Sequence, residues 1–215
     1  MEDGNGGQET SFEELVGLGV QHFGDLFSAQ ARTSLAEVVQ LSQLFPMFFE
    51  EEGNMELMKE VSEVELDEVL HSFKKDKSSG PDGWPIEFYI GFREILGGDL
   101  LSVVEESRRS GHIHNPFNTT FIALILKSDS PDSFDDFRPI SLCNCIYKII
   151  SKVISRHLKA VLSKNISAEQ FGFLEGRKIH EAVGVAQEGL HSMKTKKIKG
   201  MVIKIDLSKA YDQVI

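Results

Sequence analysis

Two aspartates, six positions apart, are the residues near the end of the sequence that could carry chemistry. Asp206 follows the apolar run "MVIKI", and Asp212 lies in "LSKAYDQV", which is typical of a turn into a helix. Transfer of a phosphoryl group to a nucleotide uses two metal ions about 4 Å apart, held by carboxylates from different segments. A strand end holds such a ligand rigidly. The spacing alone is common, so a capping or exposed aspartate is the alternative to a metal ligand.

A row of cations in the best-patterned expected helix, residues 146–162, is the second such feature. Lys148, Lys152, Arg156 and Lys159 recur at intervals of four, four and three positions, beside an apolar face. Side chains at these spacings lie on one side of a helix. This basic stripe either contacts phosphates or forms an ordinary solvated face.

The elements that would position these residues can be read from hydrophobic periodicity. Helices are expected where apolar residues recur at helical spacing: 11–27, 61–73, 86–109 with a break at Gly97 and Gly98, and 146–162. At the start of the second helix, Ser62 and Glu65 are spaced as a capping box. Strands are expected at the apolar runs 118–127 and 201–206, with a polar turn at 128–136 and an irregular connection at 28–54. The fold class is therefore α+β.

Charge is distributed unevenly along the chain, although the net value is −10. Before Lys74 there are 16 acidic and 2 basic residues, and the remainder has 17 acidic and 21 basic residues. This asymmetry indicates a polyanionic partner for the basic end. No run approaches 18 apolar residues, so no membrane partner is expected. The N-terminus has no apolar signal core, and we expect an intracellular protein, in the cytoplasm or the nucleus.

The two cysteines, Cys143 and Cys145, are one residue apart in an apolar helical pattern. No other cysteine is present to complete a zinc site, and the spacing suits neither a fold-stabilising disulfide nor a redox motif. We interpret them as small buried side chains in a reducing compartment.

Four segments taken together resemble one family: "KKDKSSGPDGWPIEFY", the stretch containing "DFRPISLCN-x-x-YKIISK", "ISAEQFGFLEGR" and "KIDLSKAYDQV". In this order they resemble the reverse transcriptase of LINE-type non-LTR retrotransposons, of the plant type. The resemblance runs from about residue 61 to residue 215. It implies helix-rich fingers and the first palm strand of a right-hand polymerase, which is incomplete here. The expected domains are an acidic N-terminal helix and linker, 1–60, and a partial reverse transcriptase domain, 61–215.

The resemblance also implies roles for individual residues. Asp206 matches the first catalytic aspartate of the palm, which binds both Mg²⁺ ions. Tyr211 matches an aromatic residue that packs under the sugar of the incoming nucleotide. Lys127 and Arg138 match basic residues of the fingers hairpin that bind the triphosphate. For Arg138 the alternative is a salt bridge to a neighbouring aspartate, and for Lys127 it is a solvated position at the strand end.

Other positions match boxes that lie near the template in the family. The "GPDG" box at 80–83 is interpreted as fold-defining turn chemistry first and template contact second. The "QxGFxxGR" box includes Gln170 and Arg177. The possible nucleic-acid contacts are therefore Lys148, Lys152, Arg156, Gln170 and Arg177.

Departures from the family pattern indicate a diverged or decayed copy. His180 stands where an Asp-Asn pair usually begins, and Leu126 stands where a proline usually precedes the lysine. The Tyr/Phe-x-Asp-Asp box that supplies the remaining carboxylates does not occur before Ile215. We therefore expect a truncated RNA-directed DNA polymerase that is inactive alone and marginally stable, because its last strand lacks partners.

The intact parent, a nucleotidyltransferase of a transposable element, would extend a DNA primer along an RNA template. It would use deoxynucleotide triphosphates and Mg²⁺. One alternative is a non-catalytic nucleic-acid-binding remnant that uses the basic stripe and the lysines at 194–204. Another is a helical interaction protein that uses the acidic N-terminal third.

Overall fold

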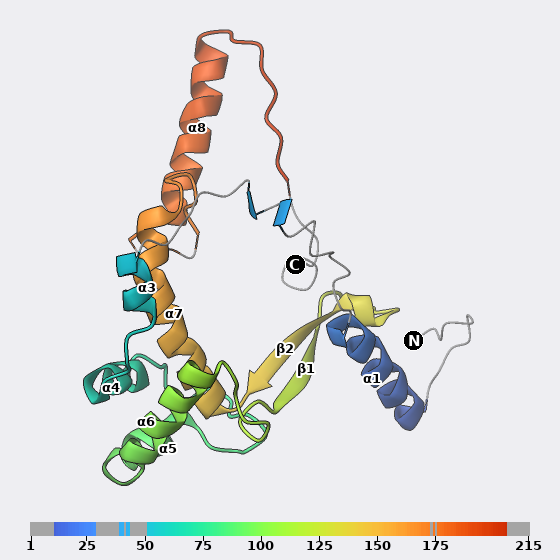
Figure 1. The fold of residues 1–215 in the computed structure, drawn as a ribbon. Helices are drawn as coiled ribbons and strands as arrows, with labels where there is room; N and C mark the ends of the chain where they lie inside the picture. The colour runs from blue at the N-terminus through green and yellow to red at the C-terminus, as the bar shows by residue number, and fades with distance from the viewer. Residues whose placement is uncertain are drawn as a thin grey trace. The chain divides into compact units, whose positions relative to one another are not determined.

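The computed structural model describes residues 11–28, 39–40, 42–43, 51–172, 174 and 176–205 (Figure 1). These residues are mostly helical, with one two-stranded sheet of β1 and β2, as expected for an α+β chain. The chain divides into two compact units. One contains α1 and most of the β1–β2 hairpin, and the other contains Pro46–Thr119 and Cys143–Lys204. The predicted domain boundary at residue 60 stays a prediction.

The first unit brings the helix α1, Phe12–Ser28, against the turn of the β1–β2 hairpin. The ring centroid of Phe134 lies 5.6 Å from that of His22 and 6.0 Å from that of Phe23, which is buried. A Cβ atom at Gly19 would lie 3.2 Å from the Phe134 ring. Glycine at this position therefore allows the helix to approach the turn closely.

The hairpin consists of β1, Thr120–Leu126, and β2, Phe137–Cys143, joined through a short 3-10 helix, η1, Phe134–Asp136. The strand predicted at 118–127 and the polar turn after it are thus confirmed. Several large apolar side chains of the two strands are exposed: Phe121, Ile122, Leu124, Ile125, Leu126 and Ile140. A two-stranded sheet is marginally stable by itself in water, so this hairpin depends on its neighbours in the fold.

The second unit is built around one hydrophobic core. Its helices are α3, Glu51–Leu57, α4, Glu63–His71, α5, Ile86–Gly91, α6, Arg93–Ser110, α7, Cys145–Asn165, and α8, Ile179–Thr195. The core residues come from the segment before α4 and from α4 to α7: Val61, Leu66, Val69, Leu70, Ile86, Tyr89, Leu100, Val104, Cys145, Ile149, Ile150 and Val153. Each fully buried Leu or Ile side chain contributes about 1.5–3 kcal/mol. Of the predicted apolar face of α7, Ile154 and Leu158 remain more than one-third exposed.

The start of α4 follows the predicted capping pattern in part. The backbone N–H of Glu65 donates to Oγ of Ser62 over 3.1 Å, as predicted. Val61 and Leu66 are both buried in the core. The Glu65 carboxylate is bound by His157, so it does not complete the capping box.

The predicted break in the helix at Gly97 and Gly98 is wrong. The interruption lies at Phe92, which separates α5 from α6 with φ −106° and ψ 23°. Gly97 is buried inside α6, and the guanidinium of Arg93 occupies the position that a Cβ atom of residue 97 would need. Glycine at this point therefore serves close packing and does not end the helix.

Among the described residues, two helices were not predicted, and the part of the predicted last strand that is described, 201–205, is not a strand. α3 begins inside the connection expected to be irregular at 28–54. α8 follows the "QxGFxxGR" box and contains no buried residue among those described. Residues 201–205 form no strand with the described part of the chain, and Val202, Ile203 and Ile205 are 65–77% exposed. Without a partner strand, the backbone of this segment has no hydrogen-bonded ladder.

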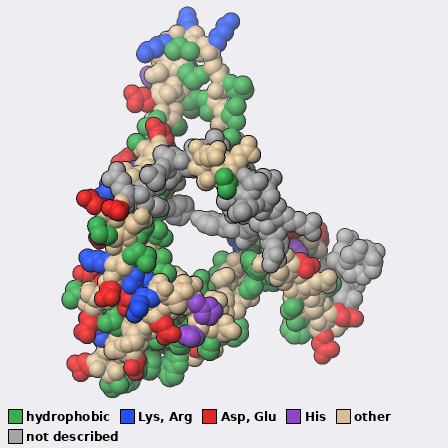
Figure 2. Space-filling model, in the orientation of Figure 1, with side chains coloured by type: hydrophobic (Ala, Val, Ile, Leu, Met, Phe, Trp, Pro, Cys, Tyr) green, Lys and Arg blue, Asp and Glu red, His purple; other side chains and the backbone are tan. Residues whose placement is uncertain are grey.

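A basic turn follows α8 at Lys196 and Lys197, the latter with a positive φ of 52°. Figure 2 shows lysine side chains gathered at this end of α8, at the top of the view. None of the helices in the described ranges is long and apolar enough to cross a membrane.

Candidate functional site

The residues predicted to carry catalysis at the end of the chain, Asp206 and Tyr211, lie outside the described residues. Among the residues that are described, no three His, Cys, Asp or Glu side chains gather as a metal site. The assignments of Asp206 and Tyr211 therefore stay predictions from sequence.

Lys127 follows β1 directly and is tied to the turn of the hairpin. Its backbone N–H donates to the carbonyl oxygen of Asp136 over 2.8 Å, and its Nζ donates to the carbonyl oxygen of Asp135 over 2.5 Å. The first of these bonds places Lys127 opposite Asp136 across the hairpin. Arg138 is the second residue of β2, two positions after Asp136.

Asp136 shapes the turn between the strands. Its Oδ2 accepts the backbone N–H groups of Ser133, over 3.1 Å, and Asp132, over 3.0 Å, and so completes a capping box around η1. These two hydrogen bonds, that of Ser133 first, hold the pKa of the Asp136 carboxyl below its ordinary range. The carboxylate is therefore committed to the turn.

Arg138 lies exposed on β2. The described part of the chain provides no ion pair for its guanidinium, to Asp135, Asp136 or any other acidic residue. An exposed guanidinium presents several N–H donors that can bind phosphate oxygens in pairs. The hairpin thus carries two cations, Lys127 at the end of β1 and Arg138 on β2, and within the described residues Arg138 has no acidic partner.

The "GPDG" box docks onto the residue that precedes α7. The backbone N–H of Asp82 donates to Oδ1 of Asn144 over 3.1 Å, and Nδ2 of Asn144 donates to the carbonyl oxygen of Pro116 over 2.9 Å. Asn144 is only 2% exposed. A Cβ atom at Gly80 would lie 2.5 Å from Oδ1 of Asn144. The close approach explains glycine at position 80 and supports a structural role for this box.

The backbone conformation of the turn at residues 80–83 explains the residue types found there. The N–H of Gly83 donates to the carbonyl oxygen of Gly80 over 3.0 Å, and Gly83 has φ +75°, which favours glycine. The N–H of Trp84 donates to Oδ1 of Asp82 over 3.1 Å. Sequence reasoning did not single out Asn144. The sequence feature that could have identified Asn144 is its position as a polar residue in an apolar run, directly before a predicted helix.

The predicted basic stripe of α7 faces α4 and the loop after it. Nζ of Lys148 donates to the carbonyl oxygen of Ser78 over 3.2 Å, and Nζ of Lys152 donates to that of Ser72 over 3.0 Å. Lys152 also lies 4.0 Å from the centroid of the Phe73 ring. Burial of this side chain, followed by the charges of Lys159 and Arg156, lowers the pKa of Lys152. These lysines therefore hold the end of α4 against α7.

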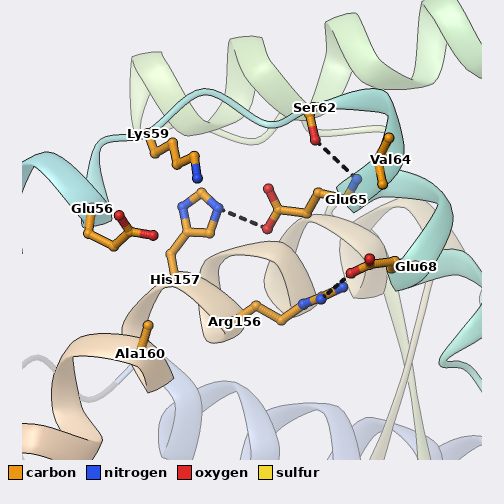
Figure 3. Close-up of a pocket in the computed structure, with 9 residues that line it drawn as sticks. All are labelled: Glu56, Lys59, Ser62, Val64, Glu65, Glu68, Arg156, His157 and Ala160. Carbon is orange, nitrogen blue, oxygen red and sulfur yellow. Dashed lines mark hydrogen bonds and ion pairs between the residues drawn. The ribbon is translucent and has the colours of Figure 1, made fainter.

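A cavity of about 280 Å³ lies further along α7, where side chains of α3, α4 and α7 line it (Figure 3). Arg156 pairs with Glu68 over 2.5 Å, and Nε2 of His157 lies 2.9 Å from Oε1 of Glu65. His157 also reaches the carbonyl oxygen of Leu57, 3.3 Å from its Nδ1.

In Figure 3 the side chains of Lys59 and Glu56 extend toward the imidazole of His157. Three cationic or histidine side chains thus face three glutamates in this cavity. Because every basic group of this cavity has glutamates beside it, the cavity offers no surplus of positive charge for phosphate.

Arg177 organises the loop between α7 and α8. Its guanidinium donates to the carbonyl oxygens of Gln170 and Ile166, each over 2.8 Å, and to that of Ser167. The side-chain amide of Gln170 donates to the carbonyl oxygen of Gly172 over 3.3 Å. The structure therefore brings these two predicted contact residues together, with their polar groups directed to the loop backbone.

Comparison with known proteins adds two findings. Residues 125–215 match the family described as reverse transcriptase (RNA-dependent DNA polymerase). Over 150 residues the chain is 31% identical to the transposon TX1 uncharacterized 149 kDa protein of Xenopus laevis. That alignment covers 70% of this chain and 12% of the relative, so the chain spans a small part of that protein's length.

Proposed function

We propose that this chain serves RNA-templated DNA synthesis by a transposable element, because part of its sequence matches the reverse transcriptase family and it is similar to a transposon protein. In this proposal it supplies the fingers and the opening of the palm of a right-hand polymerase. The motifs favour a LINE-type non-LTR element of the plant type. The intact enzyme would extend a DNA primer along an RNA template with deoxynucleotide triphosphates.

The observation that carries the proposal is the pair of cations on the β1–β2 hairpin. Lys127 and Arg138 flank the turn, and the part of the chain that is described gives Arg138 no acidic partner. A triphosphate carries several negative charges, and charge-assisted hydrogen bonds from a guanidinium are among the strong ones in proteins. The hairpin would therefore bind the triphosphate of the incoming nucleotide.

Asp206, with a neighbouring backbone carbonyl, would hold Mg²⁺. Carboxylate and carbonyl oxygens are the ligands that this ion prefers, so the donor set fits. When bound, Mg²⁺ would neutralise negative charge on the phosphates during nucleotidyl transfer. Tyr211 would pack under the sugar. On its own, this chain is proposed to bind nucleotide without extending a primer.

The test is binding of a fluorescent deoxynucleotide triphosphate to the full chain, followed by anisotropy. Arg138→Gln removes a charge-assisted interaction of about 1.5–3 kcal/mol, so we expect binding to weaken about 10-fold or more. Lys127→Gln is also expected to weaken binding of the nucleotide. Lys164→Gln, an exposed lysine near the end of α7, is the matched control with the same loss of charge. Equal affinities of Arg138→Gln and the control would contradict the proposal.

A second candidate function is nucleic-acid binding without catalysis through the lysines after α8. Lys194, Lys196, Lys197 and Lys199 are exposed at that end of the helix (Figure 2). Such binding would weaken steeply with salt, and Asp206→Ala would leave it unchanged. Replacing these lysines by glutamine discriminates this function from the first, because nucleotide binding at the hairpin would persist.

A further inference from the structure

A second cavity, of about 220 Å³, lies where the loop between α4 and α5 meets the first turns of α7. Basic, hydroxyl and aromatic side chains line it: Phe73, Lys74, Lys77, Ser78, Ser79, Trp84, Pro85, Ile86, Cys145 and Lys148. No acidic side chain is among them. In this respect the cavity differs from that of Figure 3, whose basic groups face glutamates.

The cations of this cavity are available to a ligand. Lys74 and Lys77 are exposed, and neither forms an ion pair within the described ranges. Lys148 contributes a third ammonium group, 3.2 Å from the carbonyl oxygen of Ser78. The segment that carries the first two is held in place, because the N–H of Asp76 donates to Oε1 of Glu87 over 2.7 Å. The backbone between Lys74 and Lys77 is therefore anchored to α5.

Trp84 supplies a flat apolar surface beside these cations. Its ring centroid lies 4.1 Å from that of Phe88, with 31° between the ring planes. Phe88 packs against the hydrophobic core, so the indole of Trp84 contacts a ring that is itself held by the core. Trp84 is nevertheless 49% exposed. An exposed aromatic ring beside cations is the combination with which proteins bind unpaired bases and their phosphates.

We infer that this cavity binds single-stranded nucleic acid, with one base stacked on Trp84 and neighbouring phosphates bound by Lys74, Lys77 and Lys148. A stacked base requires an unpaired strand, because bases inside a duplex present only their edges. The residues of this site belong to the second unit, whereas Lys127 and Arg138 belong to the first. It extends the proposed function by naming where an unpaired strand is held, but strand binding here does not require catalysis.

The sequence makes a direct measurement possible, because Trp84 is the single tryptophan. Stacking of a base on the indole should quench its fluorescence. We would titrate the full chain with a short oligo(U) and a short oligo(dT), and with inorganic polyphosphate as a polyanion without bases. Quenching by either oligonucleotide but not by polyphosphate is expected, and the two oligonucleotides compare RNA with DNA as the strand.

The decisive variant is Lys74→Gln with Lys77→Gln. Both side chains are exposed, so the fold should be retained, which circular dichroism would verify. Neutralising two phosphate contacts lowers the slope of log affinity against log salt by about 1.4 on a single strand, and we expect binding at low salt to weaken about 10-fold. The matched control is Lys194→Gln with Lys196→Gln, exposed lysines at the end of α8 with the same change in charge.

Three results would overturn the inference: no quenching by either oligonucleotide, equal quenching by polyphosphate, or equal weakening in the two double variants. The last would mean attraction by overall charge without a site at Trp84. Nucleotide binding by the hairpin is measured separately with Arg138→Gln. Loss of one activity with retention of the other would therefore show which of the two proposals has failed.

Discussion

Replacement of Asn144 by alanine should destabilise the second unit by about 2 kcal/mol. The side chain is 2% exposed and makes two hydrogen bonds, from the N–H of Asp82 and to the carbonyl oxygen of Pro116. A hydrogen bond of this kind contributes about 1 kcal/mol net, and both partners lie near the surface, where water can replace part of the loss. With a urea m-value of about 2 kcal/mol/M, the unfolding midpoint should fall by about 1 M.

Urea unfolding followed by far-UV circular dichroism measures this change, and Trp84 fluorescence reports the local effect because the backbone N–H of Trp84 donates to Oδ1 of Asp82. The matched control is Asn165→Ala, an exposed asparagine whose Nδ2 donates to the carbonyl oxygen of Val161 within its own helix. We expect the control to change stability by less than about 0.5 kcal/mol. If Asn144→Ala unfolded at the same urea concentration as the control, the structural role assigned to the docked box would be refuted.

Three further predictions follow from other contacts. The hydrogen bond from Arg108 holds the pKa of Glu105 below its ordinary range. Charged Glu105 therefore stabilises the fold above its unfolded-state pKa. In thermal melts across pH, the advantage of wild type over Glu105→Gln should be full at pH 7 and shrink as the pH falls through the folded-state pKa; a constant difference would contradict this. Arg177→Ala should speed chymotryptic cleavage after Phe171, between α7 and α8, because three loop carbonyls lose their donor; unchanged cleavage would count against that role. Burial raises the pKa of the Cys145 thiol to about 11, so a thiol reagent at pH 8 should modify Cys143 first and Cys145 only after unfolding.

Local patterns in the sequence predicted several elements well. Ser62 directly precedes the helix that it caps, and the strand β1 follows from an apolar β-branched run before a polar turn. The second strand, β2, was not predicted from a local pattern. The long amphipathic helix α7 was likewise visible, because eight apolar positions keep one period. Such features depend on residues close in sequence, which periodicity and capping rules describe.

Periodicity and capping rules do not predict contacts between residues that lie far apart in the sequence. The basic stripe was placed correctly on one side of α7, but periodicity does not say that Lys148 and Lys152 reach backbone carbonyls of the α4 end. The docking of Asn144 on Asp82 joins residues 62 positions apart. Gly97 was misread because a glycine that allows close packing and one that ends a helix look alike in sequence.

α8 was missed although its sequence carries a signal. Ile179, Val183, Ala186, Leu190 and Met193 recur at alternating intervals of four and three residues, a helical pattern. Gly184 and Gly189 interrupt the stretch and weaken its helical propensity. The helix also buries none of its described residues, so no core contact could have been inferred to support it.

The most direct test of the central claim, that the β1–β2 hairpin binds the triphosphate of a nucleotide, is a competition experiment with the full chain. Unlabelled deoxythymidine triphosphate and thymidine would each compete with the fluorescent nucleotide on wild type and on Arg138→Gln. The account predicts that the triphosphate competes at least 10-fold better than the nucleoside on wild type, and that Arg138→Gln removes most of this difference. Equal competition by the two ligands on wild type would contradict it.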